Sequence, residues 1–287
     1  MALALVALVA SGLLFRSFDR LRAVKPGFDP NGVVTLWVAA PPVRYPQQTD
    51  VDRFHSNLLE RVRALPGVRS ATLAYSIPLT DCCSLRGTRI EGYAARPGES
   101  TEINWNVVAT DYFRTLGIPL VQGRAFEQRD RDGAPPVVIV SEAFARRYLP
   151  GQAVLGRRIF LNGPDSPAAE VVGVVRDGKY RSLGEEPLPF FYAPLAQQYR
   201  SAMTLEVRTA GDPGAMLPLL RGRVRELAPT LPVIRPTTMR EALGVALLSQ
   251  RLGALLLGAL GAIAGLLAAL GLYGKRQNQG FGRSPMP

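Results

Sequence analysis

His55, the only histidine of the 287-residue chain, is the first residue whose type could support acid–base chemistry. A single imidazole serves as a general base only where a nucleophile and an orienting acid lie nearby. The sequence contains neither a G-x-S-x-G nucleophile elbow nor an H-E-x-x-H zinc motif that would supply such partners. Because His55 borders the apolar stripe of a helical segment, we interpret it as a structural residue.

Two adjacent cysteines, Cys82 and Cys83, are the candidates for redox chemistry. A disulfide between neighbours is strained, because ordinary disulfide geometry requires well-separated Cα atoms. Two thiols without a histidine also make a poor zinc site. A passive loop position is our preferred interpretation, and a redox-active pair or a crosslink to another chain is the alternative.

Residues 173–180, GVVRDGKY, come close to the P-loop pattern G-x-x-x-x-G-K-[ST]. Tyr180 stands where the motif needs the small hydroxyl residue that binds magnesium, and no helical pattern opens there. The segment instead predicts a strand that ends in a turn at Asp177 and Gly178.

Residues 128–133, QRDRDG, resemble the beginning of an EF-hand loop. The first ligand position is Gln128, and Ile139 at the twelfth position cannot supply the bidentate carboxylate of a calcium site. We therefore expect no catalytic residue, no cofactor and no metal site, and we expect that the protein is not an enzyme.

The segments that would position these residues follow a repeated order of strand, helix and strand. The predicted elements are strand 33–39, helix 48–65, strand 71–75, strand 203–207, helix 216–227 and short strand 232–235. This repetition predicts two βαβ-type halves of one α/β part and indicates an internal duplication. Apolar and polar residues alternate in residues 203–208, which predicts a half-buried strand.

Residues 85–195 have a different sequence pattern, in which short β-type runs alternate with Pro- and Gly-rich turns. The predicted strands are 89–93, 103–109, 136–140, 158–161 and 170–175, and the predicted helices are 111–116 and 141–148. We expect an α+β fold in which this β-rich subdomain is inserted between residues 16–84 and 196–237, the two halves of the α/β part.

Residues 252–273 form a charge-free apolar run that is long enough, as a helix, to cross a hydrocarbon core of about 30 Å. A buried core helix is the alternative. Small residues at four-residue spacing predict close packing against other membrane helices, and they are Ala254, Gly258, Gly261, Ala262 and Gly265.

Residues 1–15 are apolar as well, but they are short for a span. A signal peptide is the alternative, although no basic n-region or small-residue cleavage site supports it. We expect an incomplete membrane helix here. Lys275, Arg276 and Arg283 follow the second span and favour an extracytoplasmic position for the region between the spans.

The formal net charge is +11, but basic residues are spread along the chain among Asp and Glu. No run is dense enough to follow a phosphate backbone, so we expect no nucleic-acid partner. A basic surface of this kind suits anionic membrane lipid.

Thr238 and Glu241 have the spacing of a capping box, and no proline follows until Pro285. We therefore expect one rigid helix over residues 239–273, about 50 Å long, within a stalk and membrane segment of residues 238–274. Residues 275–287 are expected to be a disordered or aberrant tail.

Several strings resemble the periplasmic core domain of MacB-type ABC transporter permeases, closest to the acidobacterial-type permeases and related to FtsX-like ones. The strings lie in residues 105–126 (WNVVATDYFRTLGIPLVQGRAF), 137–151 (VVIVSEAFARRYLPG) and 170–194 (EVVGVVRDGKYRSLGEEPLPFFYAP). The resemblance covers residues 1 to about 274. It implies a periplasmic domain with a porter-like α/β part and an inserted β-rich part, anchored in the bacterial inner membrane.

The resemblance further implies a permease subunit without catalytic residues, coupled to a separate cytoplasmic ATPase by mechanotransmission. Further transmembrane helices or a second permease copy, and a periplasmic adaptor, are the implied partners. Family members continue at both ends, so we expect this chain to be truncated. A membrane-anchored binding or adaptor module without transport coupling is the alternative function, and a thiol oxidoreductase using Cys82 and Cys83 is the third.

Overall fold

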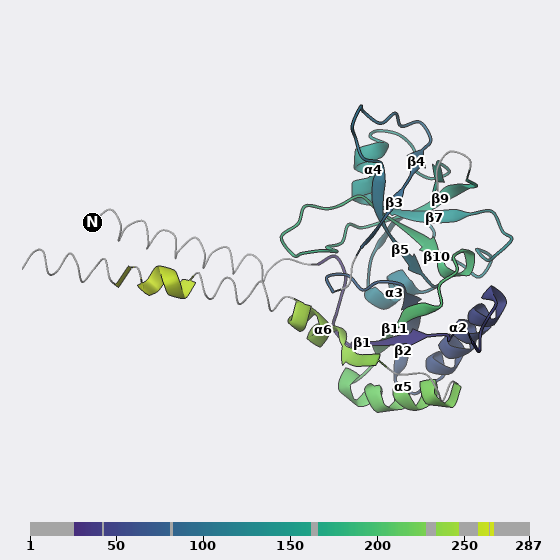
Figure 1. The fold of residues 1–287 in the computed structure, drawn as a ribbon, viewed down its shortest axis with the longest axis vertical. Coiled ribbons are helices and arrows are strands. Elements are labelled where there is room, and N and C mark those ends of the chain that lie inside the picture. The colour runs from purple at the N-terminus through teal and green to yellow at the C-terminus, as the bar shows by residue number, and fades with distance from the viewer. Residues whose placement is uncertain are drawn as a thin grey trace, which may run out of the picture. The chain divides into compact units, whose positions relative to one another are not determined.

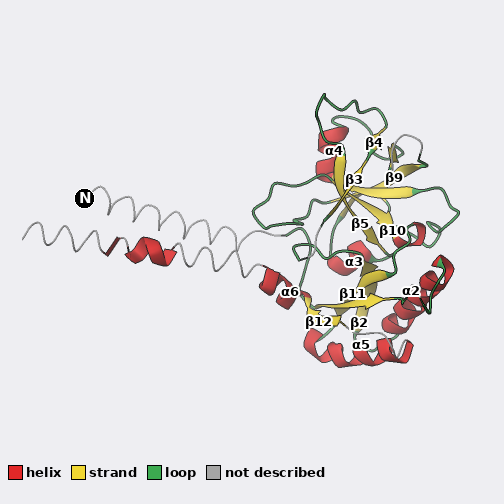
Figure 2. Cartoon of the chain, viewed as in Figure 1, coloured by secondary structure: helices red, strands yellow, loops and turns green. Residues whose placement is uncertain are grey.

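The computed structural model describes residues 26–41, 43–80, 83–161, 166–227, 234–246, 258–263 and 265–266. Contacts divide the chain into a compact unit, Lys25–Gly244, and a second unit made of Met1–Val24 and Val245–Pro287. Figure 1 shows the mixed α/β structure of the first unit, and Figure 2 distinguishes its helices from its strands.

The first predicted strand–helix–strand segment is confirmed. β1 (Val33–Ala39), α2 (Gln48–Arg63) and β2 (Val68–Ala74) follow one another. The α2 residues at helical spacing, among them Phe54 and Leu58, are buried against the sheet. Their burial removes apolar surface from water and is what fixes this amphipathic helix in place.

The second segment is also present, as β11 (Ala202–Thr209), α5 (Pro213–Leu227) and β12 (Ile234–Thr238). The strand order is β12-β1-β11-β2, and all three neighbouring pairs are antiparallel. Each helix therefore joins two parallel strands that have a third strand between them. This is the interleaved pair of split βαβ units of a ferredoxin-like arrangement, and α2 and α5 pack on the same face of the sheet (Figure 1).

The chain between β2 and β11 is β-rich, as predicted. Its elements are β3 (Ser84–Gly87), β4 (Arg89–Ile90), β5 (Glu102–Val108), α3 (Tyr112–Leu116), β6 (Leu120–Gly123), β7 (Val137–Ser141), α4 (Glu142–Tyr148), β8 (Arg158–Phe160), β9 (Ala168–Val175), β10 (Phe190–Pro194) and a 3₁₀ turn at Leu195–Gln197. We call these elements the inserted part, and those of the two βαβ units the ferredoxin-like part. The predicted domain boundaries inside the chain stay predictions.

β10 is the main element that the sequence pattern did not predict. All five of its residues are buried, so no alternation marks it, and prolines stand at or beside its ends. It pairs parallel with β5 and antiparallel with β7. A strand buried on both faces carries a continuous apolar run that periodicity alone cannot assign.

A narrow ladder joins the two parts of the sheet. The register between β2 and β5 consists of one pair, Ala74 opposite Val108. Two flanking backbone bonds extend it, from the Tyr75 N–H to the Val107 carbonyl (2.9 Å) and from the Ala109 N–H to the Leu73 carbonyl (2.8 Å). The sheet is thus continuous, but its two parts share few backbone hydrogen bonds at this junction.

The prediction that β11 is half-buried is wrong, because both of its faces are covered. Met203, Leu205 and Val207 lie in the core beneath α2 and α5. Thr204 and Glu206, on the other face, are buried too, since α3 packs against this face of β11 and β2. A polar residue in an alternating strand indicates exposure only when nothing covers its face.

The predicted capping box opens α6 (Met239–Ala246). The Glu241 N–H donates to Thr238 Oγ1 (3.2 Å), and the Thr238 N–H donates to Glu241 Oε2 (3.0 Å). Residues 258–263 and 265–266 are also helical. The rest of the predicted helix 239–273 lies outside the described residues, as do Ala254, the first apolar segment 1–15 and the tail 275–287.

No helix in the described part of the chain is long and apolar enough to cross a membrane. Gly258, Gly261, Ala262 and Gly265 lie in the short helical stretches that are described. Their predicted role in membrane helix packing stays a prediction.

Replacing Thr238 with alanine is expected to lower the free energy of unfolding by about 1 kcal/mol, because the first turn of α6 loses its side-chain acceptor. Urea unfolding of the full chain in detergent measures the change. Thr238→Ser is the matched control, since it keeps the hydroxyl oxygen. Equal losses for the alanine and serine variants would show that the cap does not stabilise α6.

Candidate functional site

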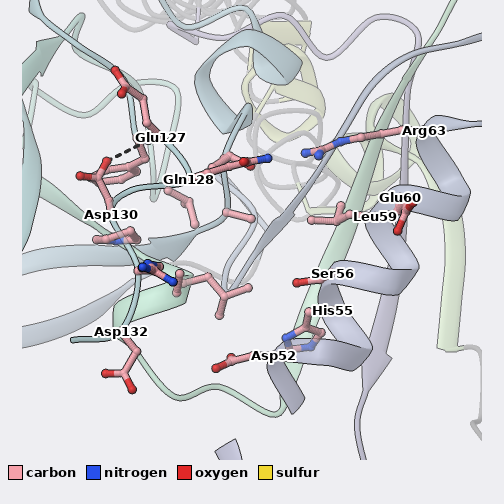
Figure 3. Close-up of a pocket in the computed structure, with 18 residues that line it drawn as sticks. Asp52, His55, Ser56, Leu59, Glu60, Arg63, Glu127, Gln128, Asp130 and Asp132 are labelled. Atoms are coloured by element: carbon pink, nitrogen blue, oxygen red, sulfur yellow. Dashed lines mark hydrogen bonds between the residues drawn. The ribbon is translucent and has the colours of Figure 1, made fainter. Parts of the chain in front are cut away.

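A cleft of about 730 Å³ lies between α2 and the inserted part (Figure 3). On the inserted side it is lined by residues that follow the carboxyl ends of β5 and β10, such as Ala109 and Leu195, and by residues 126–128 and 130–132. β5 and β10 are parallel neighbours, with Val108 opposite Pro194. Ligands of open α/β sheets bind beyond the carboxyl ends of parallel strands, so this is the position in the fold with the best precedent for binding.

His55 lies in the α2 wall of this cleft. The residue is 3% exposed, and neither ring nitrogen has a hydrogen-bond partner among the described residues. Burial lowers the pKa of His55 to about 4, so the imidazole is neutral at physiological pH. The ring packs against Phe54 at 5.6 Å between centroids, which fits a structural role, but the sequence did not predict that His55 lines a cleft.

Acidic side chains line the two sides of the cleft. Figure 3 shows Asp52 extending from α2 toward the opposite side, where Asp132 lies. Burial, together with the charge of Asp132, raises the pKa of Asp52. The sequence offered no signal for this pair, because Asp52 and Asp132 belong to segments that only the tertiary fold brings together.

The segment that resembles an EF-hand opening is held by an internal ion pair. Asp130, 4% exposed, accepts two bonds from the Arg124 guanidinium (2.7 and 2.8 Å) and one from the Glu127 N–H (2.8 Å). Burial acts to raise the pKa of Asp130, but the bonds from Arg124 and Glu127 leave it lowered. Its oxygens are thus occupied, and this bidentate pair fixes the loop that presents Asp132.

The segment that resembles a P-loop leaves the sheet at Val175 and continues as a loop without regular secondary structure, so the turn predicted at Asp177 and Gly178 is not formed. Asp177 accepts a bond from the Ala143 N–H (2.6 Å) in the first turn of α4. The carboxylate therefore satisfies a free N–H at the start of that helix. No helix directly follows this loop in the described structure, whereas a P-loop needs one directly after its glycine-rich turn.

The remaining candidate residues that the structure describes lie apart from the cleft. Cys83 is disulfide-bonded and so is not a free thiol, whereas Cys82 lies outside the described residues. No group of three or more potential metal ligands occurs among the residues that the structure describes. The structure thus brings His55 and the acidic cleft residues together, whereas Cys83 and the loop of residues 176–180 do not line the cleft.

The chain is similar to known permease domains. Its sequence matches the family model of the MacB-like periplasmic core domain over residues 1–226. Among solved structures, the periplasmic region of MacB from Actinobacillus actinomycetemcomitans is 15% identical, with a TM-score of 0.50, over 73% of this chain and 90% of that one.

The extracellular domain of the noncanonic ABC-type transporter YknZ from Gram-positive bacteria is also 15% identical, with a TM-score of 0.46, over 70% of this chain and 100% of that one. The comparison with curated proteins gives no match to this sequence. The family match spans well over half of the sequence, and the MacB structure shares the fold. The chain therefore belongs to the family of MacB-like periplasmic core domains.

Proposed function

We propose that the chain is a permease subunit, or part of one, of an ABC-type export or mechanotransmission complex in the bacterial inner membrane, with residues 25–244 in the periplasm. Its family membership supports a permease-related role. In this proposal the domain catalyses no reaction itself. It responds to a separate cytoplasmic ATPase, assembles with further transmembrane helices or a second permease copy, and meets a periplasmic adaptor.

The junction between β12 and α6 is the observation that carries this proposal. Thr238 is both the last residue of β12 and the capping residue of α6, so strand and helix meet without a linker. Met239 is fully buried, and Met239 and Leu243 pack into the core on the α3 side of the sheet. A helix anchored by hydrogen bonds and packing transmits displacement to the sheet, whereas a flexible linker would absorb it.

The test inserts four glycines after Ala246 in the intact reading frame, reconstituted with its ATPase. A four-alanine insertion is the matched control, because it adds roughly one helical turn and keeps the helix. Spin labels at Ser56 and Gln128, both exposed at the cleft, report the distance across it. The distance should differ between ATP- and ADP-bound states, and this difference should survive the alanine insertion and disappear with the glycine insertion.

A nucleotide-dependent distance that survives the glycine insertion would contradict coupling through α6.

The cleft itself favours the second candidate, a membrane-anchored binding or adaptor module without transport coupling. That function predicts no ATPase bound to the purified protein, and no effect of nucleotide on the distance between positions 56 and 128. A neighbouring gene for a separate ABC ATPase would favour transport.

A further inference from the structure

The cleft beside α2 carries negative charge that its own walls do not neutralise. Among its charged lining residues, three are already paired: Asp130 with Arg124 (2.7 Å), Glu127 with Arg129 (2.9 Å) and Arg63 with Asp111 (3.2 Å). The charged lining residues without an ion pair in the described structure are Asp52, Glu60, Asp132 and Arg131. Three carboxylates against one guanidinium leave an excess of negative charge that attracts a cation.

His55 is the second, independent observation at this cleft. A buried polar group without a hydrogen bond lowers the stability of the folded state by about 1–3 kcal/mol. Both ring nitrogens of His55 are buried and have no hydrogen-bond partner among the described residues. The neutral imidazole offers one N–H donor and one acceptor nitrogen. A ligand group that enters the cleft would supply the missing partner.

Apolar side chains complete the walls. Leu59 of α2 lines the cleft together with Phe126 and Leu195 of the inserted part, and each of the three is less than one-tenth exposed as a residue. A volume of about 730 Å³ falls in the range of small-molecule sites, which combine mostly apolar walls with a few polar groups. The site is therefore built for a ligand with an apolar body rather than for a bare ion.

We propose that the cleft binds a small organic ammonium compound. Its cationic nitrogen lies between Asp52 and Asp132, its apolar body contacts Leu59, Phe126 and Leu195, and His55 bonds a polar group on that body. A divalent metal is a poorer fit, because two carboxylates from opposite walls fall short of the six to eight oxygen ligands of calcium. An anion is disfavoured by the excess negative charge.

The ligand would bridge the ferredoxin-like part and the inserted part next to their narrow ladder at Ala74 and Val108. Binding would therefore favour one arrangement of the two parts over others. The inference does not depend on ATP-driven coupling, since binding is a property of the cleft alone.

The test uses three ligands with one apolar body: 4-phenylbutylamine, 4-phenyl-1-butanol and 4-phenylbutyrate. Equilibrium dialysis of the full chain in detergent, with empty micelles as the blank, measures saturable binding. The amine is expected to bind at least tenfold more tightly than the alcohol, and the acid is expected not to bind. Asp52→Asn and Asp132→Asn should each weaken amine binding at least tenfold.

Glu226→Gln is the matched charge control, because Glu226 is exposed on α5 and pairs with Arg223 away from the cleft. It should leave amine binding unchanged. Circular dichroism establishes that each variant is folded. Absence of saturable amine binding, equal affinity for amine and alcohol, or an affinity unaffected by Asp52→Asn and Asp132→Asn would each overturn the proposal and leave the proposed permease role untouched.

Discussion

Replacing Glu206 with glutamine is expected to raise the free energy of unfolding by about 4 kcal/mol at pH 7.5 and to change it little at pH 4.5. Glu206 is 0% exposed in the middle of β11, and neither carboxylate oxygen has a hydrogen-bond partner among the described residues. Its register neighbours are Thr35 on β1 and Thr72 on β2. Burial raises the pKa of Glu206 to about 8.

The direction of the effect follows from proton binding. Between pH 4.5 and about 8 the folded protein keeps the Glu206 proton, whereas the unfolded chain loses it. The group's contribution to stability is therefore fully present below about pH 4.5 and is lost as the pH rises toward 8, by about 1.4 kcal/mol per pH unit. Glutamine does not ionise, so the unfolding free energy of the variant does not fall in this way as the pH rises.

Urea unfolding of the full chain in detergent, followed by tryptophan fluorescence at pH 4.5 and 7.5, measures the effect. Glu170→Gln is the matched control, because Glu170 is an exposed strand residue and its substitution should not alter the pH dependence. If the wild type and the Glu206→Gln variant show the same pH dependence, Glu206 does not titrate as a buried acid.

Replacing Gly123 with alanine is expected to cost about 3 kcal/mol or more, or to prevent folding. Gly123 has φ +74°, a conformation that L side chains rarely adopt. A Cβ there would also lie 2.2 Å from the Val172 carbonyl oxygen and 2.8 Å from the Leu155 side chain. β6 pairs with β9 at this point, with Gly123 opposite Gly173, so the clash can be relieved only by separating the strands.

Gly133→Ala isolates the steric part of this effect. Gly133 has nearly the same φ, +78°, but nothing lies within 4 Å of an added Cβ. Its substitution should cost about 1 kcal/mol, which is the conformational penalty alone. Thermal and urea unfolding of both variants give the comparison. Equal destabilisation at positions 123 and 133 would mean that β6 shifts to relieve the clash without any further loss of unfolding free energy.

Local features of the sequence were sufficient to predict most elements and their ends. The apolar spacing in α2, the proline and glycine that follow it, and the two bonds between Thr238 and Glu241 all involve residues within a few positions of one another. Such interactions are encoded by neighbouring residues, so pattern reasoning finds them. The repeated strand–helix–strand order likewise predicted the two βαβ units, although not the pairing of their strands.

Long-range packing determined what the sequence could not. β10 becomes a strand because β5 and β7 take up its backbone hydrogen bonds, and Glu206 is buried because α3 covers a face that alternation assigned to solvent. The cleft arises in the same way: Asp52 and His55 meet Asp132 only after the inserted part folds against α2. Its charge and its unpartnered imidazole therefore belong to the tertiary structure, since no local pattern relates a residue of one segment to a wall built from another.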